Sequence, residues 1–374
     1  MGIPPLDAGS AARAELVVDR LRAAAGPSGF LPFDRFMEIT LYEREVGFYE
    51  QRRSPLGRAG DFYTAAHVDP IFAASVAARV RSVRASLPAA QPFLIVELGP
   101  GDGELAKGVV RSLPGELAGV EYVLIDRSLA RLDAAEERLR SVAGGPPVRR
   151  AGSVGELGPF SGVVLANEFL DAQPARRLRW DGVAWHEGGV RVTGGRVGPA
   201  EEPLSRPVPG PALPTPEAAG TVLEFSPLAE GTVREIGDHL GAGVAILLDY
   251  GMDESELLRG HPHGTLAAVR DHRSLPDPFD APGTADLSVF VNFTRVRRVA
   301  EAAGLRELAF RSQAEALGAW GFSGLLESGL RAAGSSEAKV RLQLAAKNLL
   351  FGFDRFRVLE LGPSGAEDAR APAT

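Results

Sequence analysis

The chain has 374 residues, 45% hydrophobic and 24% charged, a composition that excludes a disordered chain and allows a sizeable core. Its 41 basic and 48 acidic side chains give a formal net charge of −7, which disfavours binding to nucleic acid through phosphate contacts. The lack of cysteine excludes disulfides, thiolate catalysis and zinc–thiolate sites. Of the six histidines only His261 and His263 lie close together, so we expect no metal site.

The first ninety residues have the pattern of helices. Three stretches carry apolar side chains at helical spacing and predict helices over 11–25, 32–44 and 68–87. The start of the chain lacks the order of a secretory signal, and no apolar run is long enough to span a bilayer. We therefore expect a soluble cytoplasmic protein that binds no membrane.

From residue 93 onward, strands alternate with helices. The run FLIVEL at 93–98 is almost wholly apolar, which is typical of a strand buried on both faces. Further strands are predicted at 121–126, 148–150, 162–167, 244–250 and 353–361, and further helices at 104–113, 128–142 and 336–350. This alternation predicts an α/β protein with a doubly wound, mostly parallel sheet.

A stretch rich in proline and glycine interrupts this alternation. Residues 193–220 hold seven prolines and five glycines in 28 residues, which predicts a loop or mobile flap within an insertion around 176–235. We expect two parts, a helical N-terminal cap over the active site at 1–90 and a core at 91–374.

The segment ELGPGDG at 97–103 lies between a buried strand and a helix. Glycines there let the backbone turn sharply and approach a ligand, although a plain turn between strand and helix has the same composition. Asp126 ends the next strand, where an acid binds the two hydroxyls of a ribose. A pyrophosphate would be repelled by Glu97 and Asp102, whereas a cationic sulfonium is stabilised between carboxylates. S-adenosylmethionine (SAM) therefore fits this segment better than NAD.

The same segment resembles motif I of class I SAM-dependent methyltransferases, and most of residues 30–360 is similar to the MidA family. The segments that carry this resemblance, in the expected order, are FMEITLYEREVGFYE (36–50), GDFYTA (60–65), VELGPGDG (96–103), ANEFLDAQPAR (166–176), LLDYG (247–251) and APGTADLSVFVNF (281–293). The family includes a mitochondrial complex I assembly factor that methylates an arginine. The resemblance implies a seven-stranded Rossmann-like methyltransferase sheet with an insertion before the fifth strand.

The resemblance also implies SAM as the cofactor and a site made of several pieces. The residues assigned to the cofactor are Gly60, Asp61, Phe62, Thr64, Glu97, Gly99, Pro100, Gly101, Gly103, Asp126, Gly152, Ser153 and Asn167. The glycines of 99–103 would line the methionine end, Asp126 would bind the ribose, and Gly152 and Ser153 would lie beside the adenine. The segment 60–64 would cover the cofactor, although Asp61 and Thr64 are also good residues for capping a helix.

Glu168 and Asp171 follow the fourth strand, at the edge where doubly wound sheets bind ligands. A guanidinium does not deprotonate readily, so a methyltransferase acting on arginine needs carboxylates to localise its charge and orient one nitrogen. We predict these two residues as the catalytic pair. The alternative is structural, with Asp171 capping a helix and Glu168 binding backbone amides.

Two further features bear on the acceptor. Many members of the family have an aspartate where this chain has Asn292; if that acid contacts substrate, its loss weakens the case for arginine, and if it is structural nothing follows. His67, His261, His263 and His272 could serve as the base of an O-methyltransferase, but lone loop histidines are usually surface residues.

Three functions therefore stay open. The first is methyl transfer to a protein side chain, arginine above all, and the second is transfer to a hydroxyl or amine of a small molecule. The third is a non-catalytic assembly factor that keeps SAM as a structural ligand. The choice of acceptor lies in the N-terminal helices and the proline-rich insertion, and a homodimer is compatible with each function.

Overall fold

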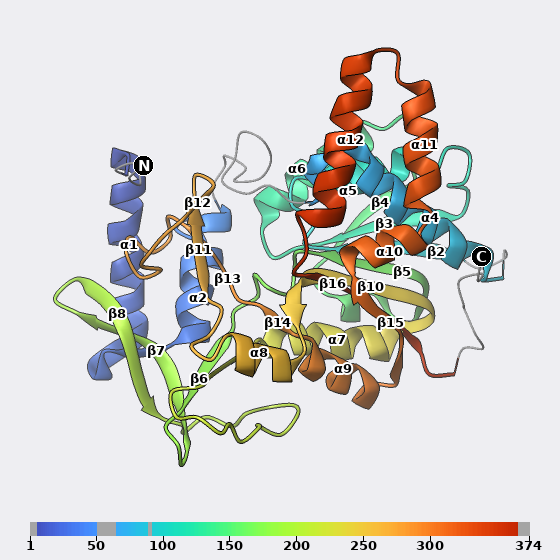
Figure 1. Cartoon of the computed structure of the whole chain (residues 1–374). Coiled ribbons are helices and arrows are strands. Elements are labelled where there is room, and N and C mark those ends of the chain that lie inside the picture. The colour runs from blue at the N-terminus through green and yellow to red at the C-terminus, as the bar shows by residue number, and fades with distance from the viewer. Residues whose placement is uncertain (1–5, 51–64, 89–91, 366–374) are drawn as a thin grey trace.

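The computed structural model describes residues 6–50, 65–88 and 92–365. Figure 1 shows an α/β core beside a smaller part that contains α1 (Ala8–Ala25), α2 (Phe33–Tyr42) and an antiparallel sheet. Within the described ranges, no helix is both long enough and apolar enough to cross a membrane.

A mostly parallel sheet forms the centre of the core. Its strands are, in spatial order, β15 (Leu305–Ser312), β16 (Phe356–Pro363), β10 (Leu240–Met252), β5 (Phe160–Asn167), β2 (Phe93–Leu98), β3 (Val120–Ile125) and β4 (Val148–Ala151). A short eighth strand, β14 (Val291–Asn292), pairs with β10. The strands from β10 to β4 are parallel, and β16 runs antiparallel to both of its neighbours. The predicted α/β fold with a doubly wound, mostly parallel sheet is confirmed.

Helices cover both faces of this sheet because its central strands are apolar on both sides. In β2, Ile95 belongs to the cluster on one face, whereas Leu94 and Val96 belong to the cluster on the other. The first cluster includes α3 (Ala65–Val68), α4 (Pro70–Ala85), α5 (Glu104–Arg111), α6 (Leu129–Arg140), α10 (Gln313–Ala319), α11 (Phe322–Ala332) and α12 (Ser336–Phe351). The second includes α7 (Pro227–His239) and α9 (Phe293–Ala302), which lie on the opposite side of the sheet from α11 and α12 in Figure 1.

The smaller part joins segments that are far apart in the sequence. Its sheet has the order β1 (Phe30–Pro32), β7 (Trp185–Thr193), β6 (Arg176–Trp180) and β9 (Val222–Phe225), and β8 (Arg196–Pro203) also pairs with β7. Leu31 lies opposite Val190, and both side chains pack in one hydrophobic cluster with α1 and α2. A second small sheet, β12 (Arg273–Ser274), β11 (Ala267–Arg270) and β13 (Asp286–Ser288), adds to the same cluster. The helix α8 (Glu254–Gly260) follows β10.

The proline-rich stretch 193–220 is more ordered than its composition suggests. The prediction of a loop without packed structure is wrong for β8, which pairs along β7. The prolines after β8 have no N–H to offer to a strand ladder, so side chains satisfy their carbonyl groups instead. Arg176 donates to the carbonyl of Pro207 (2.6 Å), and Arg295 donates to those of Pro209 and Pro211 (3.0 Å each). Trp185 donates to that of Pro214 (3.1 Å).

Candidate functional site

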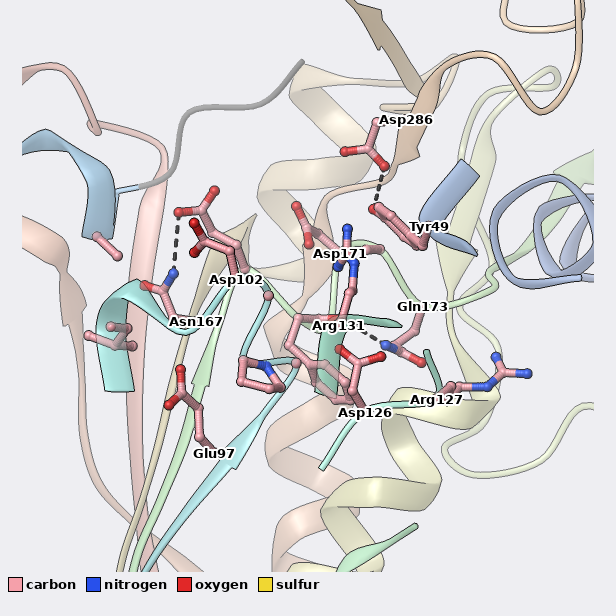
Figure 2. Close-up of a pocket in the computed structure, with 18 of the residues that line it drawn as sticks. Tyr49, Glu97, Asp102, Asp126, Arg127, Arg131, Asn167, Asp171, Gln173 and Asp286 are labelled. Atoms are coloured by element: carbon pink, nitrogen blue, oxygen red, sulfur yellow. Dashed lines mark hydrogen bonds between the residues drawn. The ribbon is translucent and has the colours of Figure 1, made fainter. Parts of the chain in front are cut away.

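A pocket lies at the carboxyl ends of β2, β3 and β5, where the N-terminal elements meet the core. Eight residues assigned from the sequence line it together: Glu97, Gly99, Pro100, Gly101, Asp126, Asn167, Glu168 and Asp171. Figure 2 shows side chains from several elements converging on this space. The carboxyl edge of a doubly wound sheet is where such folds bind their ligands.

The glycine loop has a backbone that other residues adopt only with strain. Gly99, Gly101 and Gly103 have φ angles of 64°, 56° and 81°. A Cβ atom on Gly99 would lie 2.7 Å from the ring of Phe169, and one on Gly103 would lie 2.7 Å from the Cα of Ala135. Gly99 therefore fits against the residue that follows Glu168, whereas Gly103 allows α5 to pack closely on α6.

Asp102 links the glycine loop to the N-terminal part. The Nε2 of His67, in α3, lies 3.3 Å from the Asp102 carboxylate, which also pairs with Arg138 and accepts the N–H of Glu104. Burial acts to raise the pKa of Asp102, but His67, Arg138 and the Glu104 amide outweigh it and hold the pKa below its usual value. Asp102 is therefore charged next to the N-terminus of α5, and His67 lines the pocket beside it.

Glu97 lies at the base of the pocket, at the end of β2. Its side chain is buried and accepts a hydrogen bond of 2.5 Å from the hydroxyl of Tyr122. Burial raises the pKa of Glu97 to about 8; the Tyr122 hydrogen bond acts in the opposite direction, and the charge of Asp102 adds to the rise. A cation bound above this carboxyl would favour its ionised form.

Asp126 directly follows β3 and lines the same pocket. Its Oδ1 accepts the N–H of Ser128 at 2.8 Å, and burial raises its pKa although the charge of Arg131 acts to lower it. The guanidinium of Arg131 lies 3.9 Å from the ring centre of Tyr49, and its Nε and Nη2 atoms are buried without a hydrogen-bond partner among the described residues. Figure 2 shows Arg131 extending beside Asp126 toward Asp171.

Asn167 and Glu168 follow β5. Glu168 has a φ of 53°, a left-handed conformation that is uncommon for a residue other than glycine and clusters at functional sites. Its carboxyl accepts the N–H of Ala65 (3.1 Å) and the Nδ2 of Asn167 (3.4 Å), while Asn167 Oδ1 is buried with no donor among the described groups. Burial, together with the charge of Asp171, raises the pKa of Glu168 to about 8.

Two further carboxyl groups, those of Asp171 and Asp286, line the pocket near Glu168. Asp171 is buried, and burial with the neighbouring Asp249 and Asp286 raises its pKa well above the usual value. Asp286, in β13, accepts a short hydrogen bond from the hydroxyl of Tyr49, and Figure 2 shows these two side chains pointing toward one another. The pocket wall thus carries several acidic side chains close to one another.

Sequence reasoning missed several residues of this pocket. Tyr49 and Asp286 lie inside two of the recognised motifs, 36–50 and 281–293, so the motifs themselves were the available signal. His67 was disfavoured as a lone loop histidine, yet it lines the pocket. No sequence pattern marked Arg131, which belongs to the first turn of α6.

Some assigned residues lie elsewhere. Among the described residues, Gly103, Gly152 and Ser153 are not part of the pocket lining. The N–H of Gly152 donates to Glu156 at 2.8 Å, at the end of β4. Gly60, Asp61, Phe62 and Thr64 lie outside the described residues.

Asn292 has a structural position. It caps α9 by accepting the N–H of Arg295 (3.1 Å), and its Nδ2 donates to Glu254 (3.1 Å). An aspartate could make the same capping contact, so the exchange does not bear on the acceptor.

The pocket is suited to a SAM molecule. Its carboxyl groups can stabilise the sulfonium and the ammonium, and the unpartnered Oδ1 of Asn167 can accept from an N–H of the ligand. The backbone at Gly99 and Gly101 presents no side chain toward the ligand. When SAM is bound, it supplies an electrophilic methyl group to the nucleophile of the acceptor.

Comparisons with known proteins agree with this geometry. A family model described as an S-adenosyl-L-methionine-dependent methyltransferase matches residues 73–311. The mitochondrial protein arginine methyltransferase NDUFAF7 homologue of Drosophila melanogaster is 29% identical over 313 residues, covering 76% of this chain and 70% of that protein. The Caenorhabditis elegans homologue is 26% identical over 305 residues, covering 75% and 69%. A crystal structure of a superfamily member from Burkholderia thailandensis, bound to S-adenosyl-homocysteine, has a TM-score of 0.86 at 28% identity and covers 100% of this chain and 98% of that chain.

Fold, pocket and comparisons together define a class I SAM-dependent methyltransferase, with SAM as its cofactor. Within that class the chain belongs to the MidA family.

The expectation of a cytoplasmic protein is contradicted. Both of these curated relatives are named as mitochondrial proteins. The expectation rested on the missing secretory pattern, which concerns export and does not distinguish among the compartments inside a cell.

Proposed function

We propose that this methyltransferase acts on a nitrogen of a protein side chain, and that the side chain is arginine. The observation that carries the proposal is the group of carboxyls on one pocket wall, formed by Glu168, Asp171 and Asp286. A guanidinium stays charged at all ordinary pH values, so acidic groups can both bind it and fix the direction of its nitrogens. A neutral hydroxyl acceptor would gain little from such a wall, because it has no charge to compensate.

The names of the relatives support the same acceptor. The two curated homologues compared above are called protein arginine methyltransferases. At 26–29% identity the acceptor itself can differ, so the proposal depends on the acidic wall of this chain.

We further propose how the cofactor lies. Gly99, Pro100 and Gly101 would run beside the methionine portion, Asn167 would bind its polar end, and Asp126 would bind the ribose hydroxyls, with Glu97 beneath. Gly152 and Ser153 would lie beyond the adenine, and Gly103 would act through helix packing. Of the predicted cap at 1–90, the parts that hold Tyr42, Tyr49 and His67 would cover the site, because these residues line the pocket, whereas α4 packs on the core sheet.

Transfer of a labelled methyl group from SAM tests the acceptor. Peptides that differ only in one residue, arginine, lysine or serine, are incubated with the protein, and cell-lysate proteins are mapped by mass spectrometry alongside. Label on arginine nitrogen is expected in both assays. Label confined to a small molecule of a metabolite extract would contradict the proposal, and the Asp126→Ala variant, which we expect to lose most SAM binding, serves as the control.

We also propose that two copies of this chain form a homodimer. The helix α12 exposes Val340, Leu344 and Phe351, three apolar side chains that a second copy could cover. Analytical ultracentrifugation of the wild type and of Phe351→Ser distinguishes a dimer from a monomer.

A further inference from the structure

The turn that carries Glu168 and Asp171 is held from beneath by Asp249. This residue lies in the middle of the LLDYG segment in β10, and its side chain is 0% exposed. Its Oδ2 accepts the N–H of Phe169 (3.1 Å) and that of Leu170 (2.8 Å), which are the two residues between Glu168 and Asp171. The same turn is fixed at its start because the N–H of Glu168 donates to the carbonyl of Leu248 at 2.8 Å.

The second oxygen of Asp249 has a different environment. Oδ1 is buried, and within the described part of the chain no N–H, Ser, Thr or Tyr hydroxyl donates to it. The carboxyl of Asp171, which is only 4% exposed, is the side chain that can share a hydrogen bond with the carboxyl of Asp249. Two buried carboxyls in contact cannot both be charged without a large cost, whereas one proton between them satisfies both oxygens.

We propose that Asp249 is a positioning residue that shares one proton with Asp171, so that the pair carries a single negative charge. The proton resides on Asp171 and the charge on Asp249, because the amides of Phe169 and Leu170 stabilise the Asp249 carboxylate. Asp171 therefore donates a hydrogen bond to Asp249 and presents a neutral carboxyl to the pocket. The inference holds for any methyl acceptor, because it concerns the pocket into which the cofactor binds.

Other groups around the pair determine when the proton leaves. The carboxyls of Glu168 and Asp286 face the pair, and Arg131 extends toward Asp171 with a positive charge. Tyr250 lies on the same strand as Asp249, and Tyr49 is bonded to Asp286. Burial and these neighbours raise the pKa of both Asp171 and Asp249. A sulfonium in the same pocket adds a positive charge that favours the fully ionised pair. Binding of SAM should therefore release a proton, and the neutral thioether of S-adenosylhomocysteine should release less.

Isothermal titration calorimetry measures this directly. SAM and S-adenosylhomocysteine are each titrated into the protein at pH 7 in two buffers with different ionisation enthalpies, which gives the protons released per ligand. We expect the wild type to release more protons with SAM than with S-adenosylhomocysteine. Asp249→Asn should reduce that difference, because an amide can still accept from Phe169 and Leu170 but leaves no shared proton. The part that remains comes from Glu97 and Glu168, whose pKa values are also raised.

Glu254→Gln provides the matched control. Glu254 is a buried acid beyond the end of the same strand and bonds to Asn292 outside the pocket, so its variant should release as many protons as the wild type. Asp171→Asn keeps a donor toward Asp249 and should reduce the difference as Asp249→Asn does, so it replaces Asp249→Asn if that variant fails to fold. An equal release by the wild type and the pair variants, or no difference between the two ligands in the wild type, would overturn the proposal.

Discussion

The Nε2 atom of His67 lies 3.3 Å from the carboxylate of Asp102, so a helix of the N-terminal part is joined to the glycine loop of the core. Asp102 also accepts the N–H of Glu104 at the start of α5. One carboxylate thus orders the loop and connects it to α3, whose His67 lines the pocket.

Replacing His67 tests this connection. We expect His67→Ala to weaken SAM binding by about 2- to 10-fold, because one hydrogen bond contributes a net of roughly 0.5–1.5 kcal/mol. His67→Gln, which keeps a donor of similar reach, should recover part of the affinity. Calorimetry with SAM measures both variants. Wild-type affinity in His67→Ala would show that the contact between His67 and Asp102 does not contribute to SAM binding.

Gly99→Ala tests the close approach between the glycine loop and Phe169. The new Cβ would lie 2.7 Å from the Phe169 ring, at a φ of 64°. Gly115→Ala is the matched control, because Gly115 has a φ of 74° and no atom within 4 Å of the added Cβ. Each variant should lose about 1–2 kcal/mol of stability from the left-handed backbone, but only Gly99→Ala should also lose SAM affinity. Equal SAM affinity in the two folded variants would show that the contact with Phe169 does not shape the pocket.

Glu168→Gln should lower turnover by about a hundredfold, the usual loss of roughly 2–4 kcal/mol for one charged, preorganised contact. SAM affinity should change little, since the amide can still accept the N–H of Ala65. Because the pKa of Glu168 is raised to about 8, the charged form grows with pH, so the wild-type rate should rise through neutral pH, reach half its maximum near 8 and level off above that value. The rate of the Glu168→Gln variant should lack this rise. If its rate rose over the same pH range as that of the wild type, the ionisation would belong to another group.

The pH dependence of stability follows from Glu97. In the folded protein its pKa is about 8, against 4.5 in an unfolded chain, so the folded state holds the extra proton between these values. Stability therefore falls as pH rises from 4.5 to 8, and Glu97→Gln should make the fall in Tm shallower. Glu168, Asp171 and Asp249 act in the same direction, so some fall should persist. Glu116→Gln, at an exposed acid whose pKa is lowered, should leave the slope between pH 5 and 8 unchanged, and an equal slope in Glu97→Gln would contradict the assignment.

The sequence predicted the parts of the fold that depend on local pattern. The apolar run at 93–98 and the spacing of 97–103 indicated β2 and the glycine loop, because both signals lie within a few residues. The antiparallel sheet escaped prediction since it pairs β1 with β7, and no local pattern records a partner that far along the chain. Part of the pocket lining was not predicted for the same reason, because Tyr49 and Asp286 become neighbours only through packing.

The pairing of β1 with β7 has a consequence for biosynthesis. As the chain leaves the ribosome, β1 and α2 emerge long before residues 189–191 exist to cover them. Until then the apolar side chains of Phe33 and Phe36 have no completed cluster to enter. The N-terminal part therefore completes its folding late although it is synthesised first, and until then its apolar side chains are exposed to aggregation.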